Sequence, residues 1–509
     1  NNKKDFSLLI QLINKDFNIN ISDDEKIVNS FVKDWSNTKG YADAIARPKN
    51  KYECAILLKI CYDNDILVTI SAGRTNLTGS ATPNGGIIIS TINMNKDEII
   101  INDKIATAPP GIILEDFRDS VKCLSFEKLF YPVNPTSRKD AFLGGTIMCN
   151  ASGFIPGFKG ATRQWVDGLE FLFPNGSFIK FSRGDFISNN GKFIIEFDNS
   201  MVEMVLPIYK RPNIKNASGP FSFNNHEIDF VDMIVGSEGI FGMIVSCNML
   251  LDYLPNDYLD LFIILESEKM AFKFYYFIKS YLKNFDGQLT ALEYFGYNCQ
   301  SFMKHKQKLF KNKDDVGIYL QIPIYDSLID DESEKWLKIF LESNCNINAE
   351  NIMVLTNPND YKTFFEARHS IPVNALELSN HKGTPSIITD TIVPPKNFSK
   401  YIDYVHKILQ DEKIEYLLFG HLGDCHLHFH IIPDKYQIAK AQKIYHSIIN
   451  KSSEMGGVYS AEHGTGKRKK IDFEKCYGKN AVNQVQSCKA AIDPKLLLNR
   501  GNIINIESI

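Results

Sequence analysis

Histidines are concentrated in one short segment of the chain. Four of the eleven histidines lie within the ten residues from His421 to His430. From Cys425 onward they alternate with apolar residues, so His426, His428 and His430 should share one face of a β-strand, because successive side chains of a strand point to opposite faces. Neutral imidazoles a few ångströms apart suit a borderline metal such as zinc. The segment therefore favours a metal or catalytic site over a polar sheet face with chance histidines.

A second reactive pattern is Glu462-His463-Gly464-Thr465-Gly466. A carboxylate beside an imidazole, followed by two glycines, is typical of a loop that brings a ligand oxygen and a free imidazole into one pocket. Taken alone the pattern is weak, since Glu-His pairs are also common on protein surfaces. Its interpretation depends on whether folding brings Glu462 close to the histidine-rich segment.

Arginine is rare, because the 57 basic residues comprise 47 lysines and 10 arginines. Where lysine is the default, each arginine is more informative. Arg368 stands in the run Phe365-Glu366-Ala367-Arg368-His369-Ser370-Ile371-Pro372. Its planar guanidinium suits bidentate recognition of a carboxylate. The alternative is an ordinary arginine on the surface of a helix.

Three segments rich in small residues precede these patterns. They are Ser71–Ser80, Gly144–Gly153 and Gly236–Ile244, with Pro109-Pro110-Gly111 between the first two. Without bulky side chains, backbone N–H groups can approach a diphosphate and form a nest for an anion. Each segment alone is equally typical of a turn, but their occurrence in this order favours a shared cofactor site. No GxGxxG joins a strand to a helix and no GxxxxGK[ST] occurs, which argues against a Rossmann site and a P-loop.

The elements that must position these residues differ between the two parts of the chain. We expect a polar, helical segment at 1–40, a helix at Lys51–Asn64, and short strands from Ile66–Ile70 to about Leu251. Beyond Pro255, strand-like runs alternate with helical segments, which is the α+β pattern of a second domain. The strand-like runs are Tyr258–Leu265 and Val316–Pro323, and the helical segments are Met270–Asn284 and Glu332–Asn344.

Length and composition limit the class of protein. A chain of 509 residues predicts roughly two to four domains, and 44% hydrophobic with 23% charged residues is the mix of a soluble globular protein. No apolar run approaches the roughly 18 residues of a membrane span, and no signal peptide is recognised at the start. A net charge of −3 gives no reason to expect nucleic acid as a partner. Ten cysteines without CxxC spacing predict reduced thiols, in the cytoplasm or on the inner face of the membrane, and argue against an iron–sulfur cluster.

The small-residue segments resemble, in order and spacing, the PCMH-type FAD-binding domain of the vanillyl-alcohol oxidase superfamily, over about residues 40–250. This resemblance implies FAD as the cofactor. Because residues 71–80 contain no His, we expect FAD to be held without a covalent bond. The residues that the resemblance implies for binding FAD are Ala72, Gly73, Arg74, Thr75, Asn76, Leu77, Thr78, Gly79, Ser80, Pro110, Gly111, Gly144, Gly145, Asn150, Ser152, Gly153, Glu238, Gly239, Ile244 and Asn499.

The later motifs resemble the C-terminal domain of FAD-linked 2-hydroxy-acid dehydrogenases, which comprise the D-lactate, D-2-hydroxyglutarate and glycolate-oxidising enzymes. The family patterns GHxGDGNxH and EHGxG correspond to residues 420–428 and 462–466, and residues 493–501 correspond to DPxxxLNPGK up to its glycine. The resemblance implies a divalent metal held by His421, His428 and Glu462. It also implies that His463 is the general base and that Arg368 binds the substrate carboxylate.

The chain departs from the family pattern at three positions, with Cys425 for Gly, His426 for Asn and Arg500 for Pro. The family's Asn lies near the substrate, so His426 is a further catalytic candidate and leaves the identity of the substrate open. Some relatives carry a Lys two residues before the Asp matched by Asp390, where this chain has Ile388. A substrate with a second carboxylate is therefore a less secure expectation.

The two resemblances imply an α+β fold with a PCMH-type FAD-binding domain and a cap domain whose antiparallel sheet is flanked by helices. We expect a helical segment at 1–40, the FAD-binding domain at 41–254, the cap with the metal site at 255–480, and a segment at 481–509 that returns to the FAD-binding domain. The implied reaction oxidises a D-2-hydroxy acid, D-lactate-like or D-2-hydroxyglutarate-like, to the 2-oxo acid. The metal, for which zinc is favoured, would bind the 2-hydroxyl, His463 would take its proton, and the hydride would pass to FAD N5.

Two alternatives share parts of this pattern. An alkyl-glycerone-phosphate synthase-like FAD enzyme would have the same fold, but would need a phosphate-binding cluster and a long apolar tunnel. A non-catalytic flavoprotein would use the histidines to hold a structural zinc. The sequence leaves open the particular 2-hydroxy acid, the electron acceptor, peripheral membrane contact and the formation of a homodimer.

Overall fold

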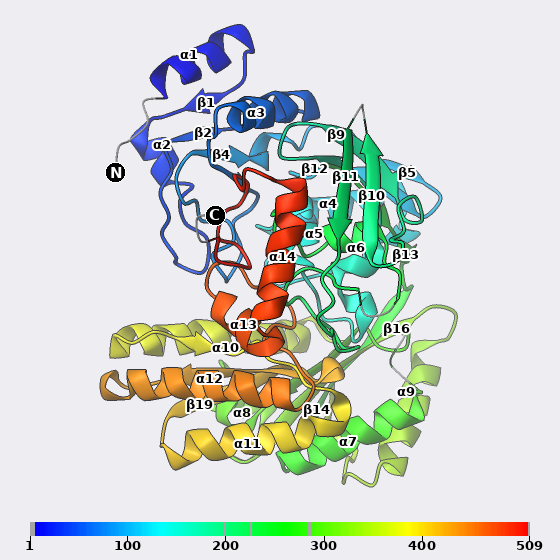
Figure 1. Ribbon diagram of the computed structural model, residues 1–509. Helices are drawn as coiled ribbons and strands as arrows, with labels where there is room; N and C mark the ends of the chain where they lie inside the picture. The colour runs from blue at the N-terminus through cyan, green and yellow to red at the C-terminus, as the bar shows by residue number, and fades with distance from the viewer. Residues whose placement is uncertain (1–5, 198–199, 224–225, 284, 286, 507–509) are drawn as a thin grey trace.

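Two bodies of sheet and helix make up the structure, a computed structural model that describes residues 6–197, 200–223, 226–283, 285 and 287–506 (Figure 1). The blue-to-teal elements and the red helix α14 form the N-terminal body, and the green-to-orange elements below them form the cap (Figure 1). The mixed α+β class predicted from the sequence is confirmed. Among the described residues, no helix is long and apolar enough to cross a membrane.

A small sheet begins the N-terminal body, in the order β1 (Ile21–Ser22), β2 (Ala44–Ala46), β4 (Ile87–Ser90) and β3 (Val68–Ser71). Strands β2, β4 and β3 are parallel. The three isoleucines of β4 are fully buried, as expected for a parallel strand that is covered on both faces. Helices α1 (Ser7–Asp16) and α3 (Lys51–Asp63) pack in the core of this sheet.

Segment 1–40, which we expect to be helical, contains the strand β1 as well as the helices α1 and α2 (Glu25–Asn29). Strand β1 pairs with β2 through Ile21 and Ser22, and the side chain of Ile21 is buried. Two residues are too few for the alternation that reveals a strand in a sequence. This segment therefore joins the sheet of the N-terminal body, while the limits of the domains stay a prediction.

A five-stranded antiparallel sheet forms the rest of the N-terminal body, with a hairpin and a two-stranded ribbon beside it. Its strand order is β5 (Ile100–Asn102), β6 (Ile105–Ala108), β12 (Met243–Leu250), β8 (Val166–Leu172) and β9 (Phe178–Ser182). The helices of this region are α4 (Leu114–Leu124), α5 (Leu143–Cys149) and α6 (Phe230–Ile234). The hairpin is β10 (Lys192–Phe197) with β11 (Ser200–Val205), and the ribbon is β7 (Leu129–Phe130) with β13 (Asp252–Tyr253).

The cap is built on a seven-stranded antiparallel sheet, which confirms the predicted architecture. Its order is β17 (Ile352–Val354), β14 (Asp257–Leu265), β16 (Val316–Ile324), β15 (Ala291–Phe295), β19 (Glu415–His421), β20 (His426–Ile432) and β18 (Ile387–Ile388). Strands β14 and β16 and helices α7 and α9 lie where the sequence patterns predict them.

The two faces of the cap sheet differ in what covers them. One face packs on four helices, α7 (Glu268–Tyr281), α9 (Ile329–Glu342), α11 (Phe398–Asp411) and α12 (Ile438–Glu454), and this core includes Leu427, Phe429 and Ile431 of β20. The long helix α10 (Pro358–Lys382) packs on the other face, in the same cluster as Leu309 of the short helix α8 (Lys306–Leu309). Since side chains alternate along a strand, the histidines of β20 lie on this second face.

The end of the chain returns from the cap to the N-terminal body. Helices α13 (Lys470–Tyr477) and α14 (Lys479–Ile492) bury Phe473, Val485 and Ile492 in the core of that body. After α14 the chain runs beside β3, where the N–H of Val68 donates to Leu497 O at 3.0 Å. The C-terminal segment therefore completes the N-terminal body.

Lys489 of α14 holds the C-terminal segment against the N-terminal body. Its buried ammonium donates to Ile240 O (2.9 Å) and Leu498 O (2.7 Å) and pairs with the carboxylate of Asp493 at 3.1 Å. We predict that Lys489→Met lowers the free energy of unfolding by about 3–5 kcal/mol, because it leaves a buried carboxylate without its partner. Denaturant unfolding measures this loss. The exposed ion pair of Lys495 gives the control, since Lys495→Met should change stability little, and an equal loss in both variants would contradict the prediction.

Candidate active site

The three small-residue segments and the C-terminal segment line one cavity in the N-terminal body. Its empty volume is about 1450 Å³, part of it open to solvent. Of the residues predicted to bind FAD, those that line it are Ala72, Gly73, Arg74, Thr75, Asn76, Leu77, Ser80, Pro110, Gly144, Gly145, Ser152, Gly153, Glu238, Gly239, Ile244 and Asn499. Segments that are far apart in the sequence therefore converge on a single hollow.

Four residues predicted to bind FAD do not line the cavity, namely Thr78, Gly79, Gly111 and Asn150. Gly111 is required by packing, because a Cβ there would lie 2.1 Å from the carbonyl oxygen of Thr91. Asn150 ends helix α5 in the left-handed conformation, with φ of 47°. Close backbone packing and close approach to a ligand select the same small residues, so the sequence pattern could not separate the two.

The histidine-rich segment forms a tight hairpin at the edge of the cap that faces the cavity. Strand β19 ends at His421, strand β20 begins at His426, and the two residues are paired across the strands. His426 and His428 lie on the sheet face opposite the helix-covered core, as predicted. His430 lies on the same face but further along the strand, where its ring contacts the hydroxyl of Ser386.

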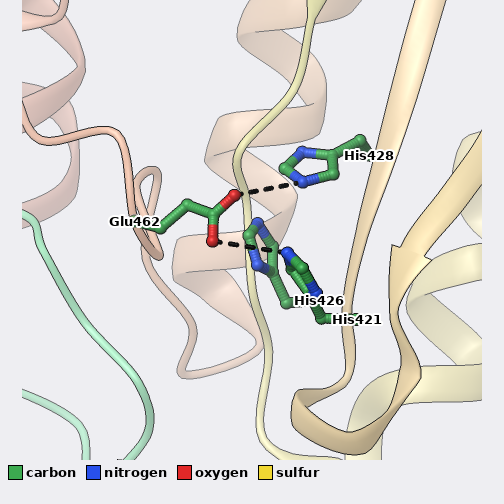
Figure 2. A group of neighbouring side chains, drawn as sticks. All are labelled: His421, His426, His428 and Glu462. Carbon is green, nitrogen blue, oxygen red and sulfur yellow. Dashed lines mark ion pairs between the residues drawn. The ribbon is translucent and has the colours of Figure 1, made fainter. Parts of the chain in front are cut away.

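Glu462 reaches this face from the loop after α12 and lies between two imidazoles (Figure 2). Its Oε1 is 3.3 Å from His428 Nε2, and its Oε2 is 3.4 Å from His421 Nε2. The ligand atoms of His421, His426, His428 and Glu462 all lie within 4.8 Å of one another. This is a donor set of imidazole nitrogens and a carboxylate that could hold a divalent cation.

The far nitrogens of two of these imidazoles are held by other groups. His421 Nδ1 lies 2.6 Å from Glu293 Oε1, and His428 Nδ1 lies 2.9 Å from Thr389 O. Such contacts to Nδ1 fix the orientation of each ring and leave its Nε2 available to a metal. Metal-binding histidines usually receive this kind of hydrogen bond from a neighbouring group. Glu293 on β15 is directly opposite His421 on β19, so the sheet itself places this support.

The charges around His421 favour a cation at this site. Burial alone would lower the pKa of His421, but the carboxylates of Glu293 and Glu462 raise it to about 10. Burial would likewise raise the pKa of Glu293, which His421 and Arg368 together lower to about 2. Two ionised carboxylates flank the imidazole of His421. They strongly favour positive charge there, whether it comes from a proton or from a bound cation.

His463 lies beside this cluster against a second buried carboxylate, that of Asp390. Its Nδ1 is 3.5 Å from Asp390 Oδ2, its Nε2 is 3.5 Å from Glu462 Oε1, and its ring stacks on that of His428. Burial lowers the pKa of His463 to about 4 against the pull of Asp390, so the imidazole is neutral near pH 7. A neutral imidazole held by a carboxylate can accept a proton.

Asp390, which lies outside the three family patterns, contacts several polar groups. It pairs with Lys469 Nζ at 2.8 Å and lies 3.1 Å from His426 Nε2, and it accepts the backbone N–H of His463 at 3.0 Å. Asp390, His428, Glu462 and His463 form a second set with ligand atoms within 4.8 Å. Because the ammonium of Lys469 already neutralises Asp390, the set of His421, His426, His428 and Glu462 suits a cation better.

Arg368 joins the cluster through Glu293. Its Nη2 lies 2.8 Å from Glu293 Oε2, and its guanidinium packs over the ring of Phe154 at 4.3 Å. Phe154, His421, Glu462 and His463 line the cavity, whereas Arg368, His426 and His428 do not. The three segments near 368, 421–428 and 462–463 therefore do converge, with Arg368 one side chain away from the cavity.

Asp424 of the histidine hairpin docks the cap on the N-terminal body. Its Oδ1 accepts the N–H of Gly157 at 2.6 Å, and its Oδ2 pairs with Lys215 Nζ at 3.0 Å. Lys215 is also 3.7 Å from Glu462 Oε2. Burial would lower the pKa of Lys215, but Asp424 and Glu462 raise it overall, so its ammonium stays charged.

Glu238, in the wall of the cavity, contacts the loop that carries Glu462 and His463. Its two carboxylate oxygens accept the N–H groups of Thr465 and Gly466, each at 2.6 Å, and its backbone carbonyl accepts the side-chain N–H of Asn499 at 2.9 Å. Burial raises the pKa of Glu238 to about 7. The loop that carries Glu462 and His463 is thus tied directly to the cavity.

Sequence reasoning missed three buried partners of the motif residues, which are Glu293, Lys215 and Lys469, and it named Asp390 only as the match of an Asp in some relatives. Only Glu293 left a signal, as an acidic residue inside the apolar run Ala291–Phe295. Lys215 lies in a loop without periodicity, and Lys469 is one of many lysines. Their importance follows from burial beside a carboxylate, which only folding brings about.

The residues present fit a flavin dinucleotide and a divalent cation. Part of the cavity wall consists of small residues such as Ala72, Gly73, Gly144, Gly145 and Gly153, so backbone N–H groups there are accessible to an anionic cofactor. Within the described ranges, Glu462 Oε2 is buried without a hydrogen bond of good geometry and lies 3.4 Å from His421 Nε2. A bound cation would satisfy such an orphaned ligand atom.

Comparison with known proteins agrees with this geometry. Residues 286–503 match the family of FAD linked oxidases, C-terminal domain, and residues 42–182 match the FAD binding domain. The chain is 25% identical to glycolate oxidase subunit GlcD of Bacillus subtilis, covering 91% of this chain and 88% of that protein. It is 24% identical to D-lactate dehydrogenase of Anaerostipes hadrus, covering 91% and 90%. The solved structure of p-cresol methylhydroxylase superposes with a TM-score of 0.69 at 15% identity, over 98% and 97% of the two chains.

Fold, cavity and matched domains together define an FAD-dependent oxidoreductase. The two matched domains show that the chain belongs to the FAD-linked oxidases, which confirms the resemblance seen in its motifs, and its fold is similar to that of p-cresol methylhydroxylase.

Glu462 is the test of the cation site. We predict that Glu462→Gln weakens binding of Zn²⁺ at least about 100-fold, because the carboxylate that contacts both His421 and His428 loses its charge. Equilibrium dialysis with metal analysis measures the affinity. Glu454→Gln, at an exposed end of α12, is the matched control and should bind like the unmodified protein. Equal affinity in the two variants would show that Glu462 is not a ligand.

Proposed function

We propose that this FAD-linked oxidoreductase oxidises a small D-2-hydroxy acid to the corresponding 2-oxo acid with the help of a divalent metal ion. The observation that carries the proposal is the convergence of His421, Glu462 and His463 on the wall of the cavity, with Arg368 linked to them through Glu293. The relatives named glycolate oxidase and D-lactate dehydrogenase support the same class of substrate.

The proposed metal ligands are His421, His428 and Glu462, and two imidazoles with one carboxylate suit zinc. Bound there, the cation would supply Lewis acidity that lowers the pKa of a substrate hydroxyl. FAD, held without a covalent bond, would supply the two-electron acceptor for the hydride that leaves C2. Since no His lies in segment 71–80, the proposal needs no attachment in this loop.

His463 is proposed as the general base. Its Nε2, on the side of Glu462, would take the proton of the 2-hydroxyl, while Asp390 on the Nδ1 side stabilises the imidazolium that forms. Proton and hydride both leave the substrate, so the product is the 2-oxo acid. His426, buried against Asp390 and away from the cavity wall, is proposed to position Asp390 rather than to touch the substrate.

Arg368 is proposed to bind the C1 carboxylate. Its Nη2 is held by Glu293, and the other donors of a guanidinium remain for a bidentate contact. Two other cations beside the cluster already pair with a buried carboxylate, Lys215 with Asp424 and Lys469 with Asp390. This pairing, together with Ile388 where some relatives have Lys, favours a substrate with a single carboxylate.

The alternatives have less support. A structural zinc would be enclosed by its ligands, whereas two of the proposed ligands line an open cavity. For an alkyl-glycerone-phosphate synthase-like reaction, the counter-argument is the spacing of Gly420-His421, Gly423-Asp424 and Glu462-His463-Gly464, which favours the dehydrogenase. The electron acceptor, peripheral membrane contact and a homodimer stay predictions.

The proposed function is tested by a panel of acids. We predict that D-lactate, another D-2-hydroxy acid with one carboxylate, or the achiral glycolate bleaches the flavin band at about 450 nm under anaerobic conditions, and that the L-enantiomers of the chiral acids do not. A chelator should abolish the bleaching, and added Zn²⁺ should restore it. A flavin that no 2-hydroxy acid reduces would reject the proposal.

The role of His463 is tested separately. We predict that His463→Ala retains FAD but slows flavin reduction by about 10²–10⁴-fold, which is the usual contribution of a general base. Stopped-flow absorbance measures the rate. His226→Ala removes an exposed imidazole of the N-terminal body and should reduce its flavin at the normal rate. If His463→Ala also keeps the normal rate, another group must take the proton.

A further inference from the structure

A buried ammonium from the N-terminal body reaches the proposed metal ligands of the cap. Lys215 lies in the loop between β11 and α6, and its side chain is only 2% exposed. Its Nζ lies 3.0 Å from Asp424 Oδ2 and 3.7 Å from Glu462 Oε2. A full positive charge therefore lies beside the carboxylate that would bind the cation.

The loop that carries Lys215 is anchored by two hydrogen bonds just after this residue. The N–H of Ala217 donates to Ser460 O at 3.2 Å, and the N–H of Gly219 donates to the hydroxyl of Thr465 at 3.2 Å. Asp424 is held independently by the N–H of Gly157 at 2.6 Å. Because the backbone is anchored and the side chain is enclosed, the ammonium cannot move out into solvent when a cation binds.

Two positive charges would then share one carboxylate. Glu462 already compensates part of the charge of Lys215, and like charges in a poorly solvated interior repel strongly. Lys215 therefore stabilises the protein without metal and opposes the binding of metal. Removing the ammonium should therefore lower the stability of the metal-free protein and raise its affinity for the metal. A residue with only a structural role would not produce both effects.

We infer that Lys215 is a built-in counter-ion by which the N-terminal body sets the metal affinity of the cap. The inference rests on the metal site of the proposed function and adds to it a residue that holds no metal itself. It also gives a reason for the contact between Asp424 and Lys215, since Asp424 holds the ammonium at a fixed distance from Glu462.

The test uses the FAD-loaded protein after metal removal, titrated with ZnCl₂ in a calorimeter without substrate. Lys215→Met, whose unbranched side chain is one heavy atom shorter and carries no charge, should bind Zn²⁺ at least about tenfold more tightly. Lys215→Arg keeps the charge and should bind within about threefold of the unmodified protein. Lys210→Met, at an exposed position of the same loop, is the matched control and should change nothing.

Thermal unfolding gives a second, independent readout. Without metal, Lys215→Met should melt at a lower temperature than the unmodified protein, because Asp424 and Glu462 lose a partner. Saturating Zn²⁺ should raise its melting temperature by more than it raises that of the unmodified protein, because a tighter ligand stabilises more. Unchanged or weaker Zn²⁺ binding by Lys215→Met would overturn the inference.

Asp424→Asn keeps the inference testable if Lys215→Met does not fold. Without the Asp424 charge, the ammonium is compensated mainly by Glu462, so Zn²⁺ should bind several-fold more weakly. Tighter or unchanged binding would overturn the inference. If the unmodified protein binds no Zn²⁺, the metal site of the proposed function fails, whereas normal binding with unaffected variants rejects only the role of Lys215.

Discussion

Everything in this site depends on the compensation of buried carboxylates. Glu293, Asp390, Asp424 and Glu462 lie in the interior between the cap and the N-terminal body, where an unpaired charge is very costly. Each finds positive charge or N–H donors on a different segment of the chain. These pairings fix the rotamers of the histidines, so the imidazoles are oriented before any ligand arrives. Neutral pairs could not hold so many polar side chains in one place.

The same contacts decide how the two bodies meet. Asp424 takes an N–H and an ammonium from the N-terminal body, and Glu238 takes two N–H groups from the loop that follows Glu462. The cavity lined by the small-residue segments and the cluster on the cap sheet consequently share a wall, which includes His421, Glu462 and His463. A redox cofactor in the cavity and a cation on the cap would then act on one substrate. Chemistry of this kind requires both bodies.

Electrostatics separates the two kinds of imidazole. His421 lies between two ionised carboxylates, so its environment favours positive charge, whether from a proton or from a metal ion. His463 is buried beside Lys469 as well as Asp390, and its pKa falls to about 4. One imidazole is suited to bind a cation and the other to accept a proton. The difference arises from neighbours supplied by β15, by the loop after β18 and by the start of α13, and not from any property of the histidines themselves.

The amino-acid sequence determined the local patterns. The alternation after Cys425 predicted which face of β20 carries histidines, and the order of the small-residue segments predicted a common cavity. Both are periodicities or spacings within one segment, which the backbone translates directly into geometry. The sequence could not assign Gly111 and Asn150, because packing and ligand approach favour the same small residues.

Only the tertiary structure decided the partners. Glu293 supports His421 because β15 and β19 are neighbours in the sheet, a fact that strand patterns do not encode. Lys215 and Lys469 acquire roles through burial beside charges that are distant in the chain. The role of a charged side chain depends on its surroundings in the fold and not on its position in a motif. These residues could therefore be recognised only after folding.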